Sequence, residues 1–418
     1  MSEVLADGAA GLMGLFDPQR VADPYPTYAW LREARPLWQP VENVLVLSRH
    51  DDCAEVLRDP RFGRSEEGRI GVRRPGPGVA GRPGRPGRPA VRSFLALNPP
   101  DHTRLRRLVS RAFTPVRVRD LGPRIETIAA ALIGAASASD GPVDLIAALA
   151  SPLPVTVISE LLGVPPEDYD RLVAWSDALA RGLDPPFLVP AEVRDRQQAA
   201  RAEFAAYLGG LIARRRRRPG HDLVSALAAV TDDGDVLSEE ELIATCILLL
   251  VAGHETTTSL IGAAVLGLLR HPEQLARLRA EPGLVDSAVE EFLRYDPPVQ
   301  LTARVALTEA SIGPMTVPAG CVALLLMGAA NRDPSLCAEP ERLDITRPPS
   351  HHLAFGLGIH FCLGAPLARL ETQIVLRLLL RRPGDFRLAG DVEWKENAVL
   401  RGVRRLPLDF TAGRVRPP

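Results

Sequence analysis

The pattern of apolar and polar positions along the chain predicts a protein built mainly of helices. Helical spacing follows a turn in DPYPTYAWLREARP and returns in RHDDCAEVLRDPRF and DHTRLRRLVSRAF, and it then dominates to about residue 230. Pro-rich breaks at 152–154, 165–166 and 185–190 divide that region. Strand-like runs are short, and they lie in VLVLS, ARVALTEASI, MTVPAGCVALLL and DFRLAG. Helix is therefore expected to be the major structure and strand the minor one.

One apolar stretch predicts a helix much longer than the others. LSEEELIATCILLLVAGHETTTSLIGAAVLGLLRHPE contains no proline before Pro272, which allows one helix of about thirty residues, roughly 45 Å long. Ser238 and Glu241 have the spacing of a capping box at its start. Because the stretch is apolar on nearly every face, we expect the helix to run through the centre of the protein.

Polar residues interrupt the middle of this stretch, in LLLVAGHETTTSL. Gly253 costs about 1 kcal/mol relative to alanine inside a helix, and Glu255 places a charge among apolar side chains. Three threonines follow, whose hydroxyls can hydrogen-bond to carbonyls one turn earlier and favour a local opening of the helix. A carboxylate beside a hydroxyl could relay protons to a group bound there. The polar face could equally reach solvent, and this stretch alone does not separate the two interpretations.

Composition narrows the class of protein. The chain has 418 residues, 46% hydrophobic and 24% charged, with a formal net charge of −1. This composition supports a large core, and the lack of a basic surplus argues against a nucleic-acid-binding protein. The five arginines of ARRRRRPG (213–220) fit the solvated C-terminal end of a helix better than a nucleic-acid patch.

Cysteine usage and the N-terminus bear on the cellular compartment. The five cysteines have no paired spacing, which indicates a reducing cytosol. The N-terminus is acidic and lacks a basic segment followed by an apolar one, so it does not resemble a signal peptide. The longest apolar run, CILLLVAG, is too short to span a bilayer. We expect a soluble, cytoplasmic protein with no membrane partner and no nucleic-acid partner.

A Gly/Arg/Pro segment breaks the helical pattern at residues 68–90. GRIGVRRPGPGVAGRPGRPGRPA includes three tandem Gly-Arg-Pro units, and no regular element persists through such a sequence. The segment is either a mobile linker or a flexible lid over a pocket, and its composition alone favours the linker.

Glycines surround Cys362 in HLAFGLGIHFCLGAPLAR (352–369). A thiolate is a soft, strongly donating metal ligand, but no other cysteine or histidine lies at zinc spacing. A lone cysteine can be the single axial ligand of a haem iron. The glycines let the backbone point N–H groups at the sulfur, the following helix favours the anion with its dipole, and Phe355 can pack against the sulfur.

Two alternatives for this loop are less consistent with its sequence. A buried, inert cysteine is the common fate of the residue, but it has no need of Gly356, Gly358 and Gly364 around it. A dinucleotide-binding loop requires a third glycine, which GLGIHF lacks at the right spacing.

With these motifs the chain resembles the cytochrome P-450 family of haem-thiolate monooxygenases, in particular its soluble bacterial class. FGLGIHFCLG (355–364) matches the cysteine signature Phe-Gly-x-Gly-x-His-x-Cys-x-Gly at every fixed position, and AGHETT (252–257) resembles the oxygen-activation motif. Glu291 and Arg294, in EEFLRYDPP, have the Glu-x-x-Arg spacing, which Glu290 does not. NPPDHTRLRRLVSRAF (98–113) and ANRDP (330–334) are typical of the same class, and the matches keep the family's order from about residue 20 onward.

The resemblance implies a fold, a cofactor and roles for the matching residues. The fold would be mainly α with small β-sheets, a helix-rich triangular prism with haem b between the long central helix and the cysteine-loop helix. Residues 1–418 would form one catalytic domain, with 1–20 as a flexible N-terminus. Cys362 would ligate the iron, and Glu291 and Arg294 would form a structural salt bridge. The other implied haem contacts are His102, Arg106, Ala252, Arg304, Phe355, Gly356, His360 and Gly364.

The resemblance also implies a reaction. Glu255 and Thr256 would be the acid–alcohol pair that delivers protons for oxygen activation, with glutamate where many relatives have aspartate. One oxygen atom from O2 would enter a lipophilic small molecule by hydroxylation or epoxidation, as in the tailoring of a polyketide, macrolide, terpenoid or steroid. The residues expected to line the substrate pocket are Leu249, Gly253, Val299, Gln300, Leu301, Val399 and Leu400. Residues 68–90 and 180–196 would be the covers of that pocket.

Expected partners follow from what the chain lacks. No flavin or iron–sulfur segment is fused to it, so a ferredoxin and a ferredoxin reductase would supply electrons to a monomeric enzyme. Four arginines on the cysteine side could form the basic docking patch: Arg104, Arg107, Arg111 and Arg369. The alternatives are a peroxygenase or haem-thiolate isomerase that needs no redox partner, against which Glu255 and Thr256 count, and a haem sensor or carrier without activity.

Overall fold

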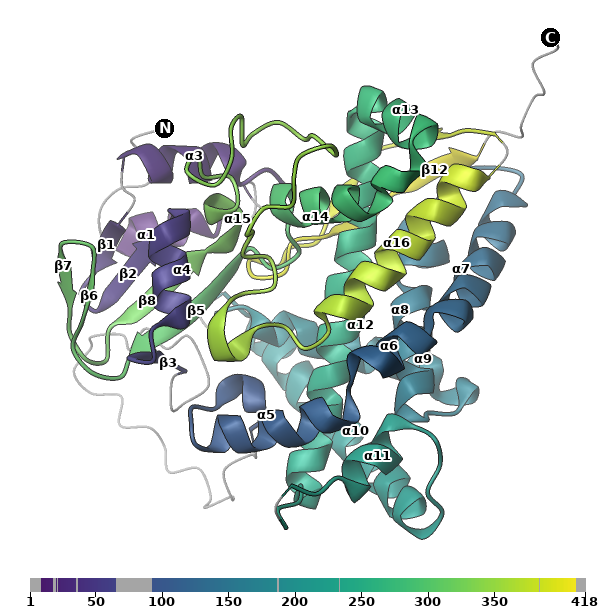
Figure 1. Cartoon of the computed structure of the whole chain (residues 1–418), viewed down its shortest axis with the longest axis horizontal. Helices are drawn as coiled ribbons and strands as arrows, with labels where there is room; N and C mark the ends of the chain where they lie inside the picture. Colours follow the sequence, from purple (N-terminus) through teal and green to yellow (C-terminus); the bar gives the residue numbers. More distant parts are fainter. Residues whose placement is uncertain are drawn as a thin grey trace.

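The long apolar stretch forms a single helix, α12 (Glu239–Arg270), which runs through the middle of the molecule (Figure 1). The computed structural model describes residues 9–17, 20, 22–34, 37–64, 92–185, 188–232, 234–382 and 384–410. The predicted capping box is present, because the Ser238 hydroxyl accepts from the Glu241 N–H and the Glu241 carboxylate accepts from the Ser238 N–H. α12 is long and apolar enough to cross a membrane by length and composition, but 72% of its most apolar window is buried inside the fold.

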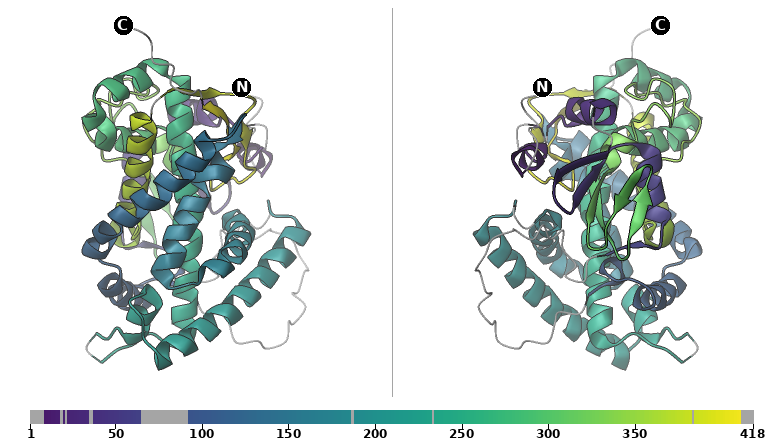
Figure 2. Two further views of the ribbon diagram at one scale, coloured as in Figure 1. Left: turned by 90° about the vertical axis from the view of Figure 1, so that its right-hand side faces the viewer. Right: turned by 90° about the vertical axis from the view of Figure 1, so that its left-hand side faces the viewer.

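Four helices make the most extensive contacts with α12 and bury much of its apolar surface. They are α8 (Pro152–Leu162), α9 (Tyr169–Ala180), α10 (Ala191–Arg217) and α16 (Ala365–Arg381). Figure 2 shows α10 crossing the lower end of α12 at a steep angle. The further helices are α1 (Ala9–Leu15), α3 (Tyr25–Ala34), α4 (His50–Arg58), α5 (Asp101–Ala112), α6 (Pro115–Asp120), α7 (Gly122–Ser137), α11 (Leu223–Ala229), α13 (Pro272–Ala280), α14 (Val285–Tyr295) and α15 (Met327–Ala330).

Short helical turns connect these elements. Five are 3-10 helices: η1 (Phe94–Ala96), η3 (Pro166–Asp168), η4 (Arg181–Leu183), η5 (Pro282–Leu284) and η6 (Gly358–His360). The π-helix η2 (Ile146–Ala150) leads into α8, whose first residue is Pro152. The prolines at 152–154 therefore start a helix rather than a loop, because proline at the first helical position loses no hydrogen bond.

The largest sheet lies to one side of α12 (Figure 1). Its strand order is β1 (Leu37–Val41), β2 (Val44–Leu47), β8 (Val322–Leu326), β5 (Leu301–Ala306) and β3 (Phe62–Gly63). β2 pairs with β8 in parallel, and the other pairs are antiparallel. In the smaller sheets, β12 (Pro407–Phe410) pairs with both β4 (Val143–Asp144) and β9 (Phe386–Leu388), β6 (Ala310–Ile312) pairs with β7 (Met315–Val317), and β10 (Glu393–Trp394) pairs with β11 (Val403–Arg405).

The predicted class, mainly helical with small sheets, is confirmed. α10 ends at Arg217, so four of the five arginines of the basic run form the last helical turn, as expected for a helix end. Within residues 1–20, where the sequence predicts a flexible terminus, Ala9–Leu15 form α1, and Leu12 and Phe16 are buried. The Gly/Arg/Pro segment at 68–90 lies outside the described residues.

Candidate functional site

The loop before α16 holds Cys362 in a tight backbone arrangement. The Cys362 N–H donates to the carbonyl of Phe355 at 3.0 Å, and the Gly356 N–H donates to that of Leu353 at 2.8 Å. Gly356 and Gly358 both have φ of +68°, a left-handed conformation that glycine adopts without steric cost. A Cβ atom on Gly358 would also lie 2.4 Å from the carbonyl oxygen of Leu57 in α4. Glycine is therefore required at 358 both by conformation and by the approach of α4.

The surroundings of the Cys362 sulfur shift the pKa of its thiol in opposite directions. Burial raises the pKa of the Cys362 thiol, while the backbone N–H groups of Gly364 and Ala365, together with the Arg106 and Arg369 guanidinium groups, act to lower it. Gly364 and Ala365 stand at the start of α16, where N–H groups are free of helical partners. The Arg106 guanidinium also donates to the carbonyl of Phe361 at 2.8 Å. A bound metal ion holds a coordinating thiol in its anionic form, and this set of donors suits a thiolate ligand.

Beside the loop, two imidazoles meet without hydrogen-bond partners. The rings of His102, on α5, and His360, on η6, have centroids 4.3 Å apart. Among the described residues, none of their four ring nitrogens has a partner, although all are buried. Burial and the neighbouring arginines lower the pKa of His360 to about 2. Both histidines are therefore neutral, and each carries one N–H that could be donated.

Two guanidinium groups complete this cluster. Arg304, on β5, is 4% exposed, and burial together with the nearby Arg64 lowers its pKa well below the usual value. Burial lowers the pKa of Arg64 to about 10, and its Nε has no partner among the described residues. Within the described part of the chain, their guanidinium N–H groups donate only to the neutral groups of Thr302 and Ala303. Buried cations that meet no carboxylate in the described part of the chain fit an acidic ligand.

The sequence motifs place His102, Arg304 and His360 in this cluster, but they miss Arg64. Arg64 directly follows the two-residue strand β3, which pairs with β5 and so brings Arg64 beside Arg304. Neither the strand nor the arginine carries a pattern of its own in DPRFGRS. Only the sheet pairing shows that the two cations share a site.

The polar middle of α12 remains helical throughout, so the expected local opening is not seen. The Thr256 hydroxyl donates to the carbonyl of Ala252 at 2.6 Å. Ala252 is exposed and Thr256 is half-buried, whereas most of the surrounding helix is buried. The two residues lie one turn apart and therefore share one face of α12. A Cβ on Gly253 would lie 3.7 Å from Ile158, so Gly253 faces α8.

Glu255 does not share that face with Thr256. Its side chain is 7% exposed and its Oε2 lies 2.6 Å from the Nζ of Lys395. Lys395 is the only lysine in the chain, yet its sequence context did not connect it with α12. Asp177, on α9, meets the same carboxylate. Sequence reasoning missed both contacts, because they depend on how α9 and the C-terminal strands pack on α12.

Glu291 and Arg294 form a buried bidentate ion pair on α14, at 2.7 and 2.8 Å. The remaining Arg294 N–H groups donate to backbone carbonyls of the segment that leads to the cysteine loop, those of Asn331, Pro340 and Arg342. Glu291 also accepts the N–H of Asp344 at 2.9 Å. The pair therefore connects α14 to residues 331–344 through both of its charges.

The structure brings together two of the segments expected to line the substrate pocket, 299–301 and 399–400. Val299 forms a β-bridge with Leu400, and the Gln300 N–H donates to the carbonyl of Val399 at 2.9 Å. Asp184, in the expected cover at 180–196, accepts the Ala398 and Val399 N–H groups. Leu249 is buried on α12.

Two of these residues also belong to a different cavity. Gln300 and Leu301 line a small cavity of about 20 Å³ beside Phe16 and Tyr28. The amide of Gln300 donates to the carbonyl of Pro297 at 2.7 Å, so its side chain is held within the protein.

The predicted basic patch is not a set of free cations. Each of its four arginines is paired with a carboxylate of the chain itself. Arg104 pairs with Asp235 and Glu241, Arg107 and Arg111 pair with the buried Asp232, and Arg369 pairs with Glu290. The attraction of this surface for an acidic partner is weaker than the arginine count indicates, because internal carboxylates offset the charge.

Comparison with known proteins gives the family. A model described as Cytochrome P450 matches residues 83–388. The chain is 41% identical over 413 residues to cytochrome P450 monooxygenase PikC of Streptomyces venezuelae, across 96% of this chain and 94% of that protein. It is 43% identical over 394 residues to vitamin D(3) 25-hydroxylase of Pseudonocardia autotrophica, across 92% and 93%. Ligand-free CYP164A2 of Mycobacterium smegmatis matches in structure with a TM-score of 0.85 at 45% identity, across 95% and 98% of the two chains.

The chain therefore belongs to the cytochrome P450 family. It is an oxidoreductase of the monooxygenase class, and the family implies a haem-thiolate cofactor. The residues present fit that group: a haem carries two carboxylates, and beside the cysteine loop lie two imidazoles without partners, those of His102 and His360, and two cations, Arg64 and Arg304, that meet no carboxylate among the described residues.

Replacing Arg304 by leucine is expected to stabilise the haem-free protein but to weaken its binding of haem. The variant removes a buried cation without a carboxylate partner, so the haem-free protein should become more stable towards urea. Haem affinity should fall by about 1.5–3 kcal/mol, roughly 10- to 150-fold, because a charge-assisted hydrogen bond is lost. Urea midpoints measure the stability of the haem-free protein, and titration with haem measures its affinity. The control is Arg387→Leu, which removes a cation from a surface ion pair with Asp409. If the variant stabilised or destabilised the haem-free and haem-loaded proteins equally, Arg304 would not be a haem contact.

Proposed function

We propose that this enzyme inserts one oxygen atom from O2 into a lipophilic small molecule, by hydroxylation or epoxidation, in the tailoring of a secondary metabolite such as a polyketide, macrolide, terpenoid or steroid. The observation that carries the proposal is the Cys362 loop, whose sulfur receives two backbone N–H groups. Beside it lie buried imidazoles without partners and buried cations that meet no carboxylate among the described residues. The relative that acts on vitamin D(3) supports a lipophilic substrate.

Haem b is the proposed cofactor, and Cys362 would ligate its iron. When bound, the haem supplies oxygen activation and the transfer of one oxygen atom to the substrate. His102, Arg304 and His360, joined by Arg64, would donate to its propionates. Arg106 would act at the same edge, next to the cysteine loop. Ala252, Phe355, Gly356 and Gly364 would contact the remaining surface of the haem and shield the sulfur from water.

Thr256 and Glu255 are the proposed proton donors of the site. The Thr256 hydroxyl lies on the exposed face of α12 with Ala252, where it would be free to exchange its bond to the Ala252 carbonyl for one to a molecule bound beside that face. Glu255 points about 100° away from Thr256, as adjacent helix residues do. A water molecule, or a rotation of the Glu255 side chain, therefore has to connect the two.

The proposed substrate wall combines Val299, Val399 and Leu400 with Leu249 and Gly253 of α12. Gln300 and Leu301 would support this wall from behind, since both also line the cavity beside Tyr28.

We further propose a single domain over residues 1–418, a monomer in the cytoplasm, and a ferredoxin with its reductase as electron donors. Bacterial members of the family normally use redox partners, which supports the proposal that separate proteins donate the electrons.

Turnover with isotopically labelled dioxygen tests the proposed function. NADPH, a ferredoxin, its reductase and a panel of lipophilic compounds should yield a product that contains one labelled oxygen atom. A panel member that enters the site should also shift the haem spectrum from low to high spin. Efficient turnover with hydrogen peroxide alone, and none with NADPH, would instead indicate a peroxygenase. Absence of any oxidised product and any spin shift would indicate a haem carrier.

The Thr256→Ala variant should separate proton delivery from binding. Product formation is expected to fall by about 100-fold, the lower range for loss of a positioned proton donor, while NADPH oxidation continues and releases peroxide. Thr256→Ser keeps the hydroxyl and should retain most of the product. The spin shift on substrate binding should be unchanged in both variants. A Thr256→Ala variant that keeps full product yield would exclude the assigned role.

A further inference from the structure

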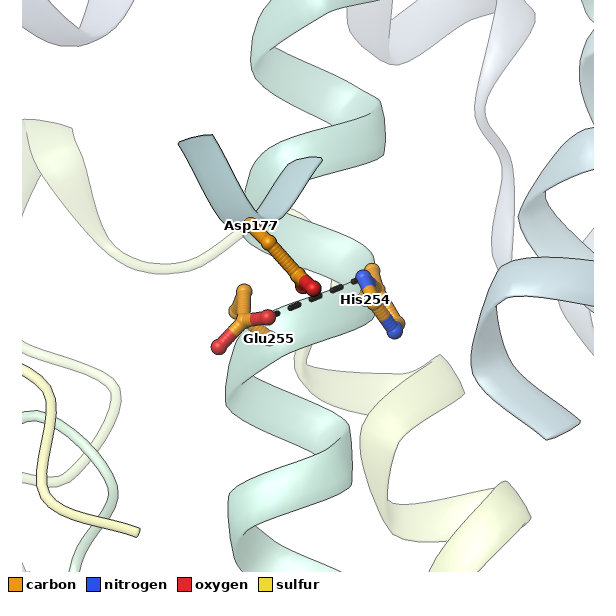
Figure 3. A group of neighbouring side chains, drawn as sticks. All are labelled: Asp177, His254 and Glu255. Atoms are coloured by element: carbon orange, nitrogen blue, oxygen red, sulfur yellow. Dashed lines mark ion pairs between the residues drawn. The ribbon is translucent and has the colours of Figure 1, made fainter. Parts of the chain in front are cut away.

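Three elements that lie far apart in the sequence meet at Glu255. The carboxylate comes from the middle of α12, Lys395 comes from the segment after β10, and Asp177 comes from α9. Figure 3 shows Asp177 pointing from α9 towards Glu255, with His254 beside them. The ligand atoms of Asp177, His254 and Glu255 all lie within 4.8 Å of one another.

Lys395 keeps Glu255 ionised. Burial alone would raise the pKa of Glu255, but the Lys395 ammonium and the hydrogen bond from Asp177 outweigh it and hold the pKa below its usual value. The Lys395 Nζ to Glu255 Oε2 distance is 2.6 Å. Glu255 is therefore a carboxylate that can accept a proton.

The pKa of Asp177 is shifted upward, opposite to that of Glu255. Burial and the hydrogen bond to the Glu255 carboxylate raise the pKa of Asp177 to about 7. The protein around the Asp177 carboxyl group partly removes it from water, but the residue as a whole is exposed, whereas Glu255 is 5% exposed. The pair thus joins a carboxyl group that reaches solvent and holds a proton near neutral pH to a buried carboxylate on α12.

The other charged groups around the pair do not replace either member. His254 is neutral, because burial lowers its pKa, and its two ring nitrogens contact the hydroxyls of Ser151 and Ser176 at 3.0 and 2.9 Å. Arg181, one turn beyond Asp177 at the start of η4, lies 3.9 Å from Glu396 and hydrogen-bonds to Asn397.

The same arrangement argues against a metal site at Asp177, His254 and Glu255. The Lys395 ammonium already supplies a cation at Glu255, and both nitrogens of His254 are engaged by serine hydroxyls. A divalent ion would have to displace or repel the ammonium at close range. Proton exchange, in contrast, needs only the two carboxyl groups in contact.

We propose that Asp177 is the solvent-facing entry of the proton route, which takes a proton from water and passes it to Glu255. The inference rests on the proposed function, because it adds a donor before Glu255 and Thr256. A hydronium ion gives its proton to the Asp177 carboxylate, and the new O–H donates to Glu255. As the O–H bond forms at Glu255, the one at Asp177 breaks, and Asp177 returns to its carboxylate form. No electrons are transferred between the two groups.

Asp177→Asn, Asp177→Glu and Asp170→Asn test this route. Asp170 is an exposed carboxylate on the same helix, two turns earlier, and provides the matched control. In the haem-loaded enzyme, Asp177→Asn should lower the product formed per NADPH oxidised by about tenfold or more, and the dependence of product yield on pH around 7 should be lost. Asp177→Glu should restore both, and Asp170→Asn should match the unmodified protein.

Infrared difference spectroscopy provides a readout that does not depend on turnover. The unmodified protein should show a protonated-carboxyl band that disappears as pH rises through about 7, and Asp177→Asn should lack it while Asp170→Asn retains it. A normal product yield in Asp177→Asn would overturn the proposal, as would a loss that Asp177→Glu does not restore, or a band that persists in Asp177→Asn. If the unmodified protein forms no product with NADPH, the proposed function fails, and the band still decides whether Asp177 holds the exchangeable proton.

Discussion

The Cys362→Ser variant is expected to lose all monooxygenase activity and the far-red-shifted absorbance of the reduced, carbon monoxide-bound protein. A serine hydroxyl is a hard, weakly acidic oxygen donor, whereas the thiolate is a soft ligand that pushes electron density onto iron. The backbone of the loop should survive the change, because its hydrogen bonds run from the Cys362 N–H to Phe355 and from Gly356 to Leu353. Visible spectra and product formation measure the effect.

A cysteine elsewhere in the chain supplies the control for that experiment. Cys337 is a free, partly buried cysteine in the segment before the loop. Cys337→Ser should keep the red-shifted band and the activity. If Cys362→Ser retained the band, or if Cys337→Ser lost it, Cys362 would not be the iron ligand.

Replacing Arg294 by leucine is expected to lower the free energy of unfolding by about 3–5 kcal/mol, the cost of leaving a buried charge without its partner. The Arg294 side chain is 0% exposed and that of Glu291 is 2% exposed. The substitution would leave the Glu291 carboxylate only the longer contact to Arg347, at 3.4 Å, among the described cations. It would also remove three hydrogen bonds to the carbonyls of Asn331, Pro340 and Arg342. Urea unfolding, followed by circular dichroism, measures the loss.

The chain contains a closely matched control pair. Glu339 and Arg342 also have the three-residue spacing, but their side chains are 72% and 59% exposed. Arg342→Leu should therefore cost less than about 1 kcal/mol, as exposed ion pairs do. Similar losses in the Arg294 and Arg342 variants would show that the Glu291–Arg294 pair does not stabilise the segment before the cysteine loop.

Local features of the fold were predictable where the signal lies within a few residues. The Ser238–Glu241 capping box and the absence of proline before Pro272 located α12 to within a residue at its start. The runs VLVLS and ARVALTEASI located β2, β5 and β6. The two-residue strands β3, β4 and β10 were missed, because so short a run carries no periodicity. Their existence follows from the partners that they meet across a sheet.

The sequence was least informative about which charged side chains form pairs. The arginines at 104, 107, 111 and 369 looked like an open basic patch, but the fold brings Asp232, Asp235, Glu241 and Glu290 to them. Conversely, Arg64 and Arg304 carry no visible sign of isolation in the sequence, yet the described part of the structure gives neither a carboxylate. Whether these charges are paired depends on contacts with residues 79 to 137 positions away, and no local pattern encodes them.

The sequence by itself determined the family motifs, the long central helix and the backbone freedom around Cys362, since capping, helical periodicity and glycine conformation all act between neighbouring residues. Tertiary structure alone decided which side chains share a site. It brought Arg64 to Arg304 through the pairing of β3 with β5, and it brought Asp177 and Lys395 to Glu255 through the packing on α12. The physical reason is that burial and electrostatic coupling depend on distance in space, and in this chain the coupled groups lie up to about 240 residues apart in sequence.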